Sequence, residues 1–281
     1  KFFKTWTLPI SMLAGAIGYF VFANVTFLEP TKPFMYTLIA YLTPFLIFAQ
    51  LLLTFCKISV RELMPSPWHG WLLLIQAVSS LVLAALLLWL PMREEYRDVF
   101  EGAMVCLICP TATAAAVITG KLGGSASSLT TYTLLSNLLA AIVVPLVFPL
   151  VEPHAEITFF AAFLNILGKV FPLLLFPFFL ALFLRRFIPP IHRFLAGLRD
   201  MAFYLWAVAL AIVTGQTVKS LVNSEAEIYV EILIALGGLI TCIAQFYWGK
   251  RIGKKYNDRI SAGQALRQKN TVLAIWMSYT Y

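Results

Sequence analysis

The sequence is divided into apolar stretches of the length that one helix needs to cross a lipid bilayer, about 20 residues. These stretches are continuous rather than alternating, which excludes a transmembrane β-barrel. The mean hydropathy of +0.85 and the 12% content of charged residues exclude an ordinary soluble domain. The sequence therefore predicts an all-α polytopic membrane protein with these spans: Trp6–Val25, Met35–Phe55, His69–Leu90, Asp98–Ile118, Ser125–Leu150, Ile157–Phe183, Leu198–Lys219, Ile228–Trp248 and a ninth from about Ser261.

Turn and charge clusters separate the spans, among them the proline-containing segment Phe187–Ile191, which we expect to be a simple turn. The ninth stretch reaches Tyr281 before a span is complete, and the sequence starts at Lys1. We therefore expect at least one more helix to follow. The first stretch has no small-residue cleavage site at its end, so we interpret it as a helix rather than a signal peptide.

The net charge of +8 is explained by where the basic residues lie relative to the membrane. With a cytoplasmic N-terminus, most basic residues lie on one side, as the positive-inside rule requires. The sequence thus favours a multi-pass protein of the inner (plasma) membrane with its N-terminus in the cytoplasm, and a nucleic-acid partner is not expected. The opposite loops hold only Lys32, Arg93, Arg97 and Lys219.

Two stretches interrupt the apolar pattern at membrane depth. The ninth contains Arg267 and Lys269, whose charges require a bundle interior, a water-filled cavity or a partner. The fourth contains Pro110, which cannot donate a helical hydrogen bond, followed by a run of small residues. Broken helices at matching positions of two repeats are the best sequence pointer to a transporter's binding site. The alternative is a kinked helix with a small-residue packing face.

The two interrupted stretches resemble the bile acid:sodium symporter family. Cys109-Pro110, Thr113-Ala114 and Leu122–Gly124 are similar to that family's fourth helix and the turn after it, and 268–274 resembles its ninth. The resemblance implies a single transporter domain over 1–281 with ten helices, nine of them seen here. It also implies two inverted five-helix repeats, 1–150 and 157–281, with the fourth and ninth helices broken and crossing, and a core domain that moves against a panel domain.

The chain departs from the family at the residues that hold sodium. The resemblance implies a Ser-Asn pair where Ala115 and Ala116 stand, and a glutamate where Ala265 stands. An alanine side chain offers no oxygen ligand. Gln76 and Thr133 remain, which is too little to hold two sodium ions.

The resemblance places Lys269 where the family has a glutamine, and the lysine ammonium can take the place of a bound cation. We expect it to reach backbone carbonyls of the fourth-helix break and Gln76. It then acts either as a permanent positive strut or as a proton carrier, because the pKa of a lysine shifts readily on burial. The predicted ion-coupling residues are Lys269, Gln76, Thr133 and Gln268.

Positive side chains near half-helix ends favour an anionic substrate. Arg267 either binds a carboxylate with its planar fork or extends to the membrane surface. The predicted substrate-binding residues are Arg267, Asn270, Thr271, Thr111 and Thr113.

The sequence and the resemblance together predict a secondary active transporter of organic anions, bile-acid-like or small carboxylates, that works by alternating access. We expect the usual sodium sites not to be used. The expected coupling ion is a proton carried by Lys269, or else sodium bound in another way, and we expect no cofactor. The sequence lacks the common serine-triad, zinc-protease and P-loop patterns, which argues against an enzyme or an ATP-driven pump. Two alternatives remain: arsenite efflux with Cys109 as the metalloid ligand, and a non-transporting membrane sensor.

Overall fold

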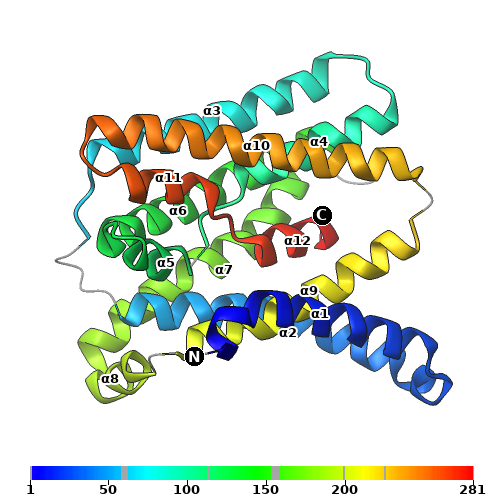
Figure 1. The fold of residues 1–281 in the computed structure, drawn as a ribbon, viewed down its shortest axis with the longest axis horizontal. Helices are drawn as coiled ribbons and strands as arrows, with labels where there is room; N and C mark the ends of the chain where they lie inside the picture. Colours follow the sequence, from blue (N-terminus) through cyan, green and yellow to red (C-terminus); the bar gives the residue numbers. More distant parts are fainter. Residues whose placement is uncertain are drawn as a thin grey trace. The chain divides into compact units, whose positions relative to one another are not determined.

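The computed structural model describes residues 2–57, 63–112, 114–152, 158–198, 200–224 and 226–280. Helices make up nearly all of these residues, and in the described part of the chain the only β-type pairing is one isolated bridge (Figure 1). The elements are α1 (Phe2–Asn24), the 3₁₀ helix η1 (Thr26–Thr31), α2 (Lys32–Cys56), α3 (Pro67–Trp89), α4 (Glu94–Ile108), α5 (Ala115–Lys121), α6 (Ala126–Val151), α7 (Phe159–Phe187), α8 (Pro189–Gly197), α9 (Met201–Val222), α10 (Ile228–Lys255), α11 (Arg259–Arg267) and α12 (Thr271–Thr280).

Seven of these helices, namely α1, α2, α3, α6, α7, α9 and α10, are long and apolar enough to cross a membrane, counting only the described residues. The remaining predicted spans are the fourth, which is α4 plus α5, and the ninth, which is α11 plus α12. Each is split into two pieces that are individually too short. The prediction of an all-α polytopic membrane protein is confirmed.

The short helix α8 was not predicted. Its segment contains the Pro189-Pro190 pair, which we expected to form a simple turn. Proline at the first helical position has the backbone angle that a helix needs and lacks only an N–H that would be unpaired there. The helix is interrupted at Ile188, as the prediction requires, but the two prolines then start a short helix instead of a turn.

Local signals explain how several helices begin. The backbone N–H of Ser66 donates to Nδ1 of His69 at 2.9 Å, which fixes the first turn of α3. The hydroxyl of Ser125 accepts from the backbone N–H of Ser128 at the start of α6. Between α5 and α6 the chain turns at Gly123, whose φ of +83° is a conformation that side chains disfavour.

The chain divides into two compact units, and each combines segments that are distant in sequence. The first unit comprises 1–57, 177–225 and 271–280, and the second comprises 58–176, 226–270 and residue 281. Each unit draws on both predicted repeats, 1–150 and 157–281. The repeat boundaries themselves stay a prediction.

Small residues allow close helix packing in both units. In the first unit α1 packs on α9 at Gly15, where an added Cβ would overlap the backbone oxygen of Ala211. In the second unit α10 packs on α11 at Gly249 and Gly253, and an added Cβ at either position would overlap Ala262. Close backbone approach of this kind is the usual role of small residues at helix contacts in membranes.

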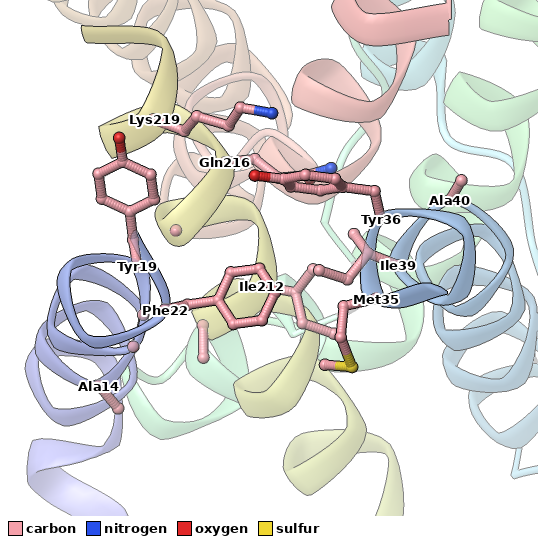
Figure 2. A pocket seen from close by; sticks show the side chains of 14 residues that line it. Ala14, Tyr19, Phe22, Met35, Tyr36, Ile39, Ala40, Ile212, Gln216 and Lys219 are labelled. Carbon is pink, nitrogen blue, oxygen red and sulfur yellow. The ribbon is translucent and has the colours of Figure 1, made fainter. Parts of the chain in front are cut away.

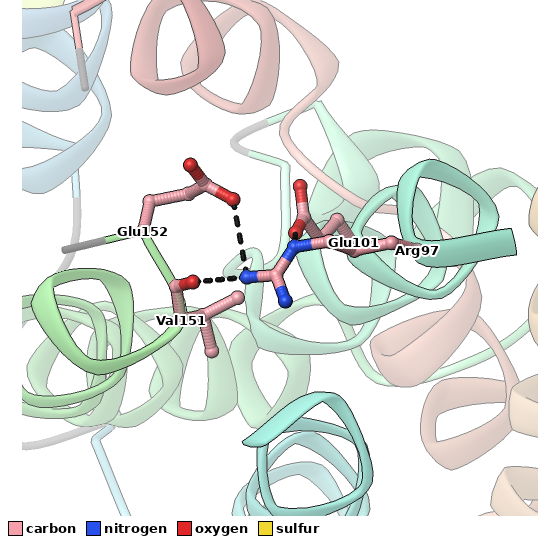
Figure 3. A network of polar contacts seen from close by, with 4 residues as sticks. All are labelled: Arg97, Glu101, Val151 and Glu152. Carbon is pink, nitrogen blue, oxygen red and sulfur yellow. Dashed lines mark hydrogen bonds and ion pairs between the residues drawn. The ribbon is translucent and has the colours of Figure 1, made fainter. Parts of the chain in front are cut away.

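A polar network connects the start of α4 to the end of α6 in the second unit (Figure 3). The Arg97 Nε lies 2.8 Å from Oε1 of Glu101, one helical turn away. Its Nη2 lies 3.4 Å from Oε1 of Glu152 and also donates to the carbonyl oxygen of Val151. One guanidinium thus holds α4 against the last turn of α6.

Candidate functional site

The site lies where two unwound segments of the second unit pass each other. The first interruption runs from the end of α4 at Ile108 to the start of α5 at Ala115, and the second runs from the end of α11 at Arg267 to the start of α12 at Thr271. Their extended segments pair antiparallel through a bridge between Thr111 and Lys269. The prediction that both helices are broken and cross is confirmed.

Two backbone hydrogen bonds hold the crossing together. The N–H of Asn270 donates to the carbonyl of Pro110 at 2.9 Å, and the N–H of Ala112 donates to the carbonyl of Gln268 at 2.8 Å. Unwound backbone inside a membrane protein must find such partners, because an unpaired polar group in lipid costs several kcal/mol. The two breaks therefore satisfy each other.

Lys269 lies beside the C-terminal end of α4. Its Nζ donates to the carbonyl oxygen of Leu107 at 3.2 Å, and its side chain is half-buried. The last carbonyls of a helix have no partner within the helix and carry the negative end of its dipole. A positive charge is therefore stabilised at this position, where the sequence predicted that the ammonium would meet backbone carbonyls.

Gln76 from α3 satisfies the next two carbonyls of the same helix end. Its Nε2 donates to the carbonyl of Ile108 at 3.0 Å and to that of Cys109 at 3.2 Å. Lys269 and Gln76 thus share three consecutive carbonyls. The sequence predicted that the ammonium would also reach Gln76 itself, whereas the described contacts place the two side chains on neighbouring acceptors.

Two hydroxyl groups of α6 orient the Gln76 amide. The Tyr132 hydroxyl donates to Oε1 of Gln76 at 3.1 Å, and Oγ of Ser136 lies 3.3 Å from the same atom. Ser136 also accepts from the backbone N–H of Thr111 at 3.2 Å. All three side chains are buried, so this network is shielded from bulk solvent.

Side chains of the crossing form further bonds across it. The Thr111 hydroxyl donates to the carbonyl of Ala265 at 2.7 Å, which uses its donor within the protein. The Cys109 thiol, also buried, donates to the carbonyl of Asn270 at 3.1 Å. The Gln268 amide donates to Oε1 of Gln264 at 2.6 Å, in the last turn of α11.

Three of the positions where the family resemblance implies sodium ligands are apolar and buried. Ala115 and Ala265 have no exposed surface, and Ala116 is 9% exposed. They belong to one hydrophobic cluster in which the rings of Trp68 and Tyr132 stack with centroids 5.7 Å apart. The other members of this cluster are Leu72, Leu129, Ala262 and Leu266.

The remaining predicted site residues are placed differently. The Thr133 hydroxyl donates to the carbonyl of Leu129 in its own helix, at 3.0 Å. Arg267 is exposed, with its guanidinium 4.8 Å from the centroid of the Phe246 ring. Thr271 is exposed at the start of α12, and Thr113 lies outside the described residues. The roles predicted for these residues stay predictions.

Sequence reasoning missed Trp68, Tyr132 and Ser136. Tyr132 and Ser136 are four residues apart, a spacing that places two side chains on one face of a helix. That spacing could have marked a polar face on α6. Nothing in the sequence connects it to Gln76, which comes from another helix.

In the described part of the chain, no group of three His, Cys, Asp or Glu side chains could hold a metal ion. The Cys109 thiol donates its hydrogen to the carbonyl of Asn270, and the arsenite alternative stays a prediction.

Comparison with known proteins supports the resemblance. A search of curated proteins found no relative that matches the chain. The model of the Sodium Bile acid symporter family matches residues 43–224, which is more than half of the sequence and includes the first break but not the second. This protein is a multi-pass membrane protein that belongs to the sodium bile acid symporter family, whose members are transporters of bile acids and other organic anions.

Proposed function

We propose that this protein is a secondary active transporter of organic anions that works by alternating access without sodium at the helix crossing. Alternating access requires two parts of the protein that move as separate units. The two compact units support this, because each has its own internal packing. We place the protein in the inner (plasma) membrane with its N-terminus in the cytoplasm, on the positive-inside distribution of its lysines and arginines.

One observation carries the proposal: the Lys269 ammonium donates to the Leu107 carbonyl at the end of a half-helix. Unwound backbone and half-helix C-terminal ends are where transporters of this kind coordinate a cation. A covalently attached ammonium supplies the same positive charge there. It cannot dissociate, so no sodium gradient can be coupled through it.

The apolar cluster supports the same conclusion. Sodium prefers hard oxygen ligands, and Ala115, Ala116 and Ala265 present only methyl groups.

The proposed substrate is an anion, bile-acid-like or a small carboxylate. Arg267 is exposed two residues before Lys269, and its guanidinium can bind a carboxylate with two parallel hydrogen bonds. Asn270 and Thr271 follow at the start of α12, where the helix dipole favours negative charge. Thr111 and Thr113 complete the proposed contacts, although the donor of Thr111 is already used within the crossing.

Lys269 has two possible roles in the cycle. As a strut it stays charged and holds the crossing together. As a proton carrier it releases its proton in one state of the transporter and regains it in the other, which couples transport to a proton gradient.

Counterflow in proteoliposomes tests the proposal. We expect exchange of labelled taurocholate or pyruvate at equal rates in sodium and in choline buffers. A steep dependence on sodium would overturn the claim, and absence of counterflow with any organic anion would overturn transport in favour of a sensor. An imposed proton gradient separates the two roles: it drives uptake through a proton carrier and leaves a strut-based transporter unaffected.

A further inference from the structure

The first unit contains a cavity of about 480 Å³ between α1, α2 and α9 (Figure 2). This volume is within the range of about 300–1,000 Å³ that is typical of ligand pockets. All of its lining residues belong to the first unit, so it includes none of the residues at the crossing. None of the predicted substrate-binding or ion-coupling residues lines this cavity.

The body of the cavity is apolar. Figure 2 shows the Phe22 ring, the Ile212 side chain and the Met35 thioether facing the same space. Gly18 contributes bare backbone on α1, and an added Cβ there would meet no atom within 4 Å. Such a wall is suited to a hydrocarbon chain and not to a small hydrated ion.

One end of the cavity carries a positive charge. The Lys219 Nζ lies 3.9 Å from the centroid of the Tyr36 ring, which holds the half-buried lysine in place. No carboxylate in the described part of the chain forms an ion pair with Lys219. Nearby, the Tyr19 hydroxyl accepts from Nδ2 of Asn223 at 3.2 Å, and its own hydrogen can serve a ligand.

The geometry points to a binding site for a single-chain amphipathic carboxylate, a fatty-acid anion, with its head on Lys219 and its chain between α1, α2 and α9. The lysine favours a negative head and opposes a cation, and the apolar wall favours a long chain over a small anion. A phospholipid shares this chemistry, but its two chains need more room than one cavity of this volume offers. The inference is independent of the proposed function, because no residue of the crossing takes part.

The test is direct binding of radiolabelled palmitate to the full-length protein in nanodiscs. We expect saturable binding that unlabelled palmitate displaces, and that neither hexadecanol nor acetate displaces. Lys219→Met should weaken palmitate binding about tenfold, which corresponds to the loss of about 1.4 kcal/mol, while Lys219→Arg should retain most of it. Gly18→Phe should abolish binding by filling the cavity, and Gly168→Phe is its matched control, since that glycine also faces open space but lies on α7.

Several outcomes would overturn the inference. Equal displacement by hexadecanol would show that charge plays no part, and normal binding by Lys219→Met or Gly18→Phe would place palmitate elsewhere. Displacement of labelled palmitate by phosphatidylglycerol at lower concentrations than unlabelled palmitate needs would identify a phospholipid as the preferred occupant. Lys269→Met distinguishes a failure of this inference from a failure of the proposed function. Palmitate binding should survive in that variant whether or not it transports.

Discussion

The crossing has two sides of opposite chemistry. On one side, Gln76 and Lys269 donate to the three carbonyls at the end of α4. On the other, Ala115 and Ala265 are packed in a dry hydrophobic cluster. The same two broken helices thus contribute to a polar side that binds charge and to an apolar side that excludes it.

We propose that the lysine of the polar side and the alanines of the apolar side belong together. Once a lysine supplies a charge that cannot leave, the oxygen ligands of a mobile cation have no function. Left in place without an ion, each buried oxygen would cost about 1–3 kcal/mol as an unsatisfied group. Alanine removes that cost and fills the space with apolar contacts.

The largest expected effect comes from placing a charge on the apolar side. Ala265→Glu should lower the free energy of unfolding by about 3–5 kcal/mol, because a carboxylate there is buried and unpaired. Chemical denaturation in detergent measures the change. Arg267→Glu, at an exposed position two residues away, is the control and should lower it by no more than about 1 kcal/mol, the value of its contact with the Phe246 ring. A folded Ala265→Glu protein that sodium stabilises would refute the distinction between the two sides.

The second effect concerns the polar side. Lys269→Met should lower the free energy of unfolding by about 2 kcal/mol, since the Leu107 carbonyl loses a charged donor, and it should abolish anion counterflow. Lys269→Arg should be intermediate, because a planar guanidinium does not fill a point-charge site. Lys121→Met removes a lysine from the exposed end of α5 and should behave like the wild type. Full activity of Lys269→Met would make this lysine incidental.

A smaller effect is expected at Tyr132, which orients the Gln76 amide on the polar side. Tyr132→Phe should lower the free energy of unfolding by about 1 kcal/mol, because Gln76 loses one donor while Ser136 remains. The matched control is Tyr256→Phe, whose hydroxyl accepts a bond from Trp71 at an exposed site. Equal thermal stability of the two variants would mean that the Gln76 amide is not held by Tyr132.

The smallest effect is expected at Thr133. Its hydroxyl serves only its own helix in the described contacts, so Thr133→Val should change the free energy of unfolding by about 0.5 kcal/mol or less. Counterflow and its response to sodium should also be unchanged. A loss of counterflow in a folded Thr133→Val protein would return Thr133 to an ion-binding role and contradict the assignment of all charge to the polar side.

The spans and their two breaks were predictable because their signals are local. A long apolar run predicts a helix, and Pro110 or the Arg267–Thr271 segment interrupts it without reference to the rest of the chain. The expectation of carbonyl partners for Lys269 also followed from local physics, since a charge at this depth must be paired.

Contacts between distant residues were not predictable in the same way. Gln76 and Tyr132 are 56 residues apart, and only the packing of α3 on α6 brings them together. The misassigned segment Pro189–Gly197 shows a different limit: the same proline pair is compatible with a turn or with the first turn of a helix. The conformation of the residues that follow the proline pair decides between a turn and a helix.

The contact of Gly249 and Gly253 with Ala262 has a mechanical consequence. With backbone against backbone there is no layer of flexible side chains to absorb sliding, so a rotation of α11 carries α10 with it. α10 has 28 residues and forms a rod of about 42 Å. The glycines lie near one end of that rod, which therefore acts as a lever: a tilt of about 5° at Gly249 becomes a displacement of about 3 Å at Ile228.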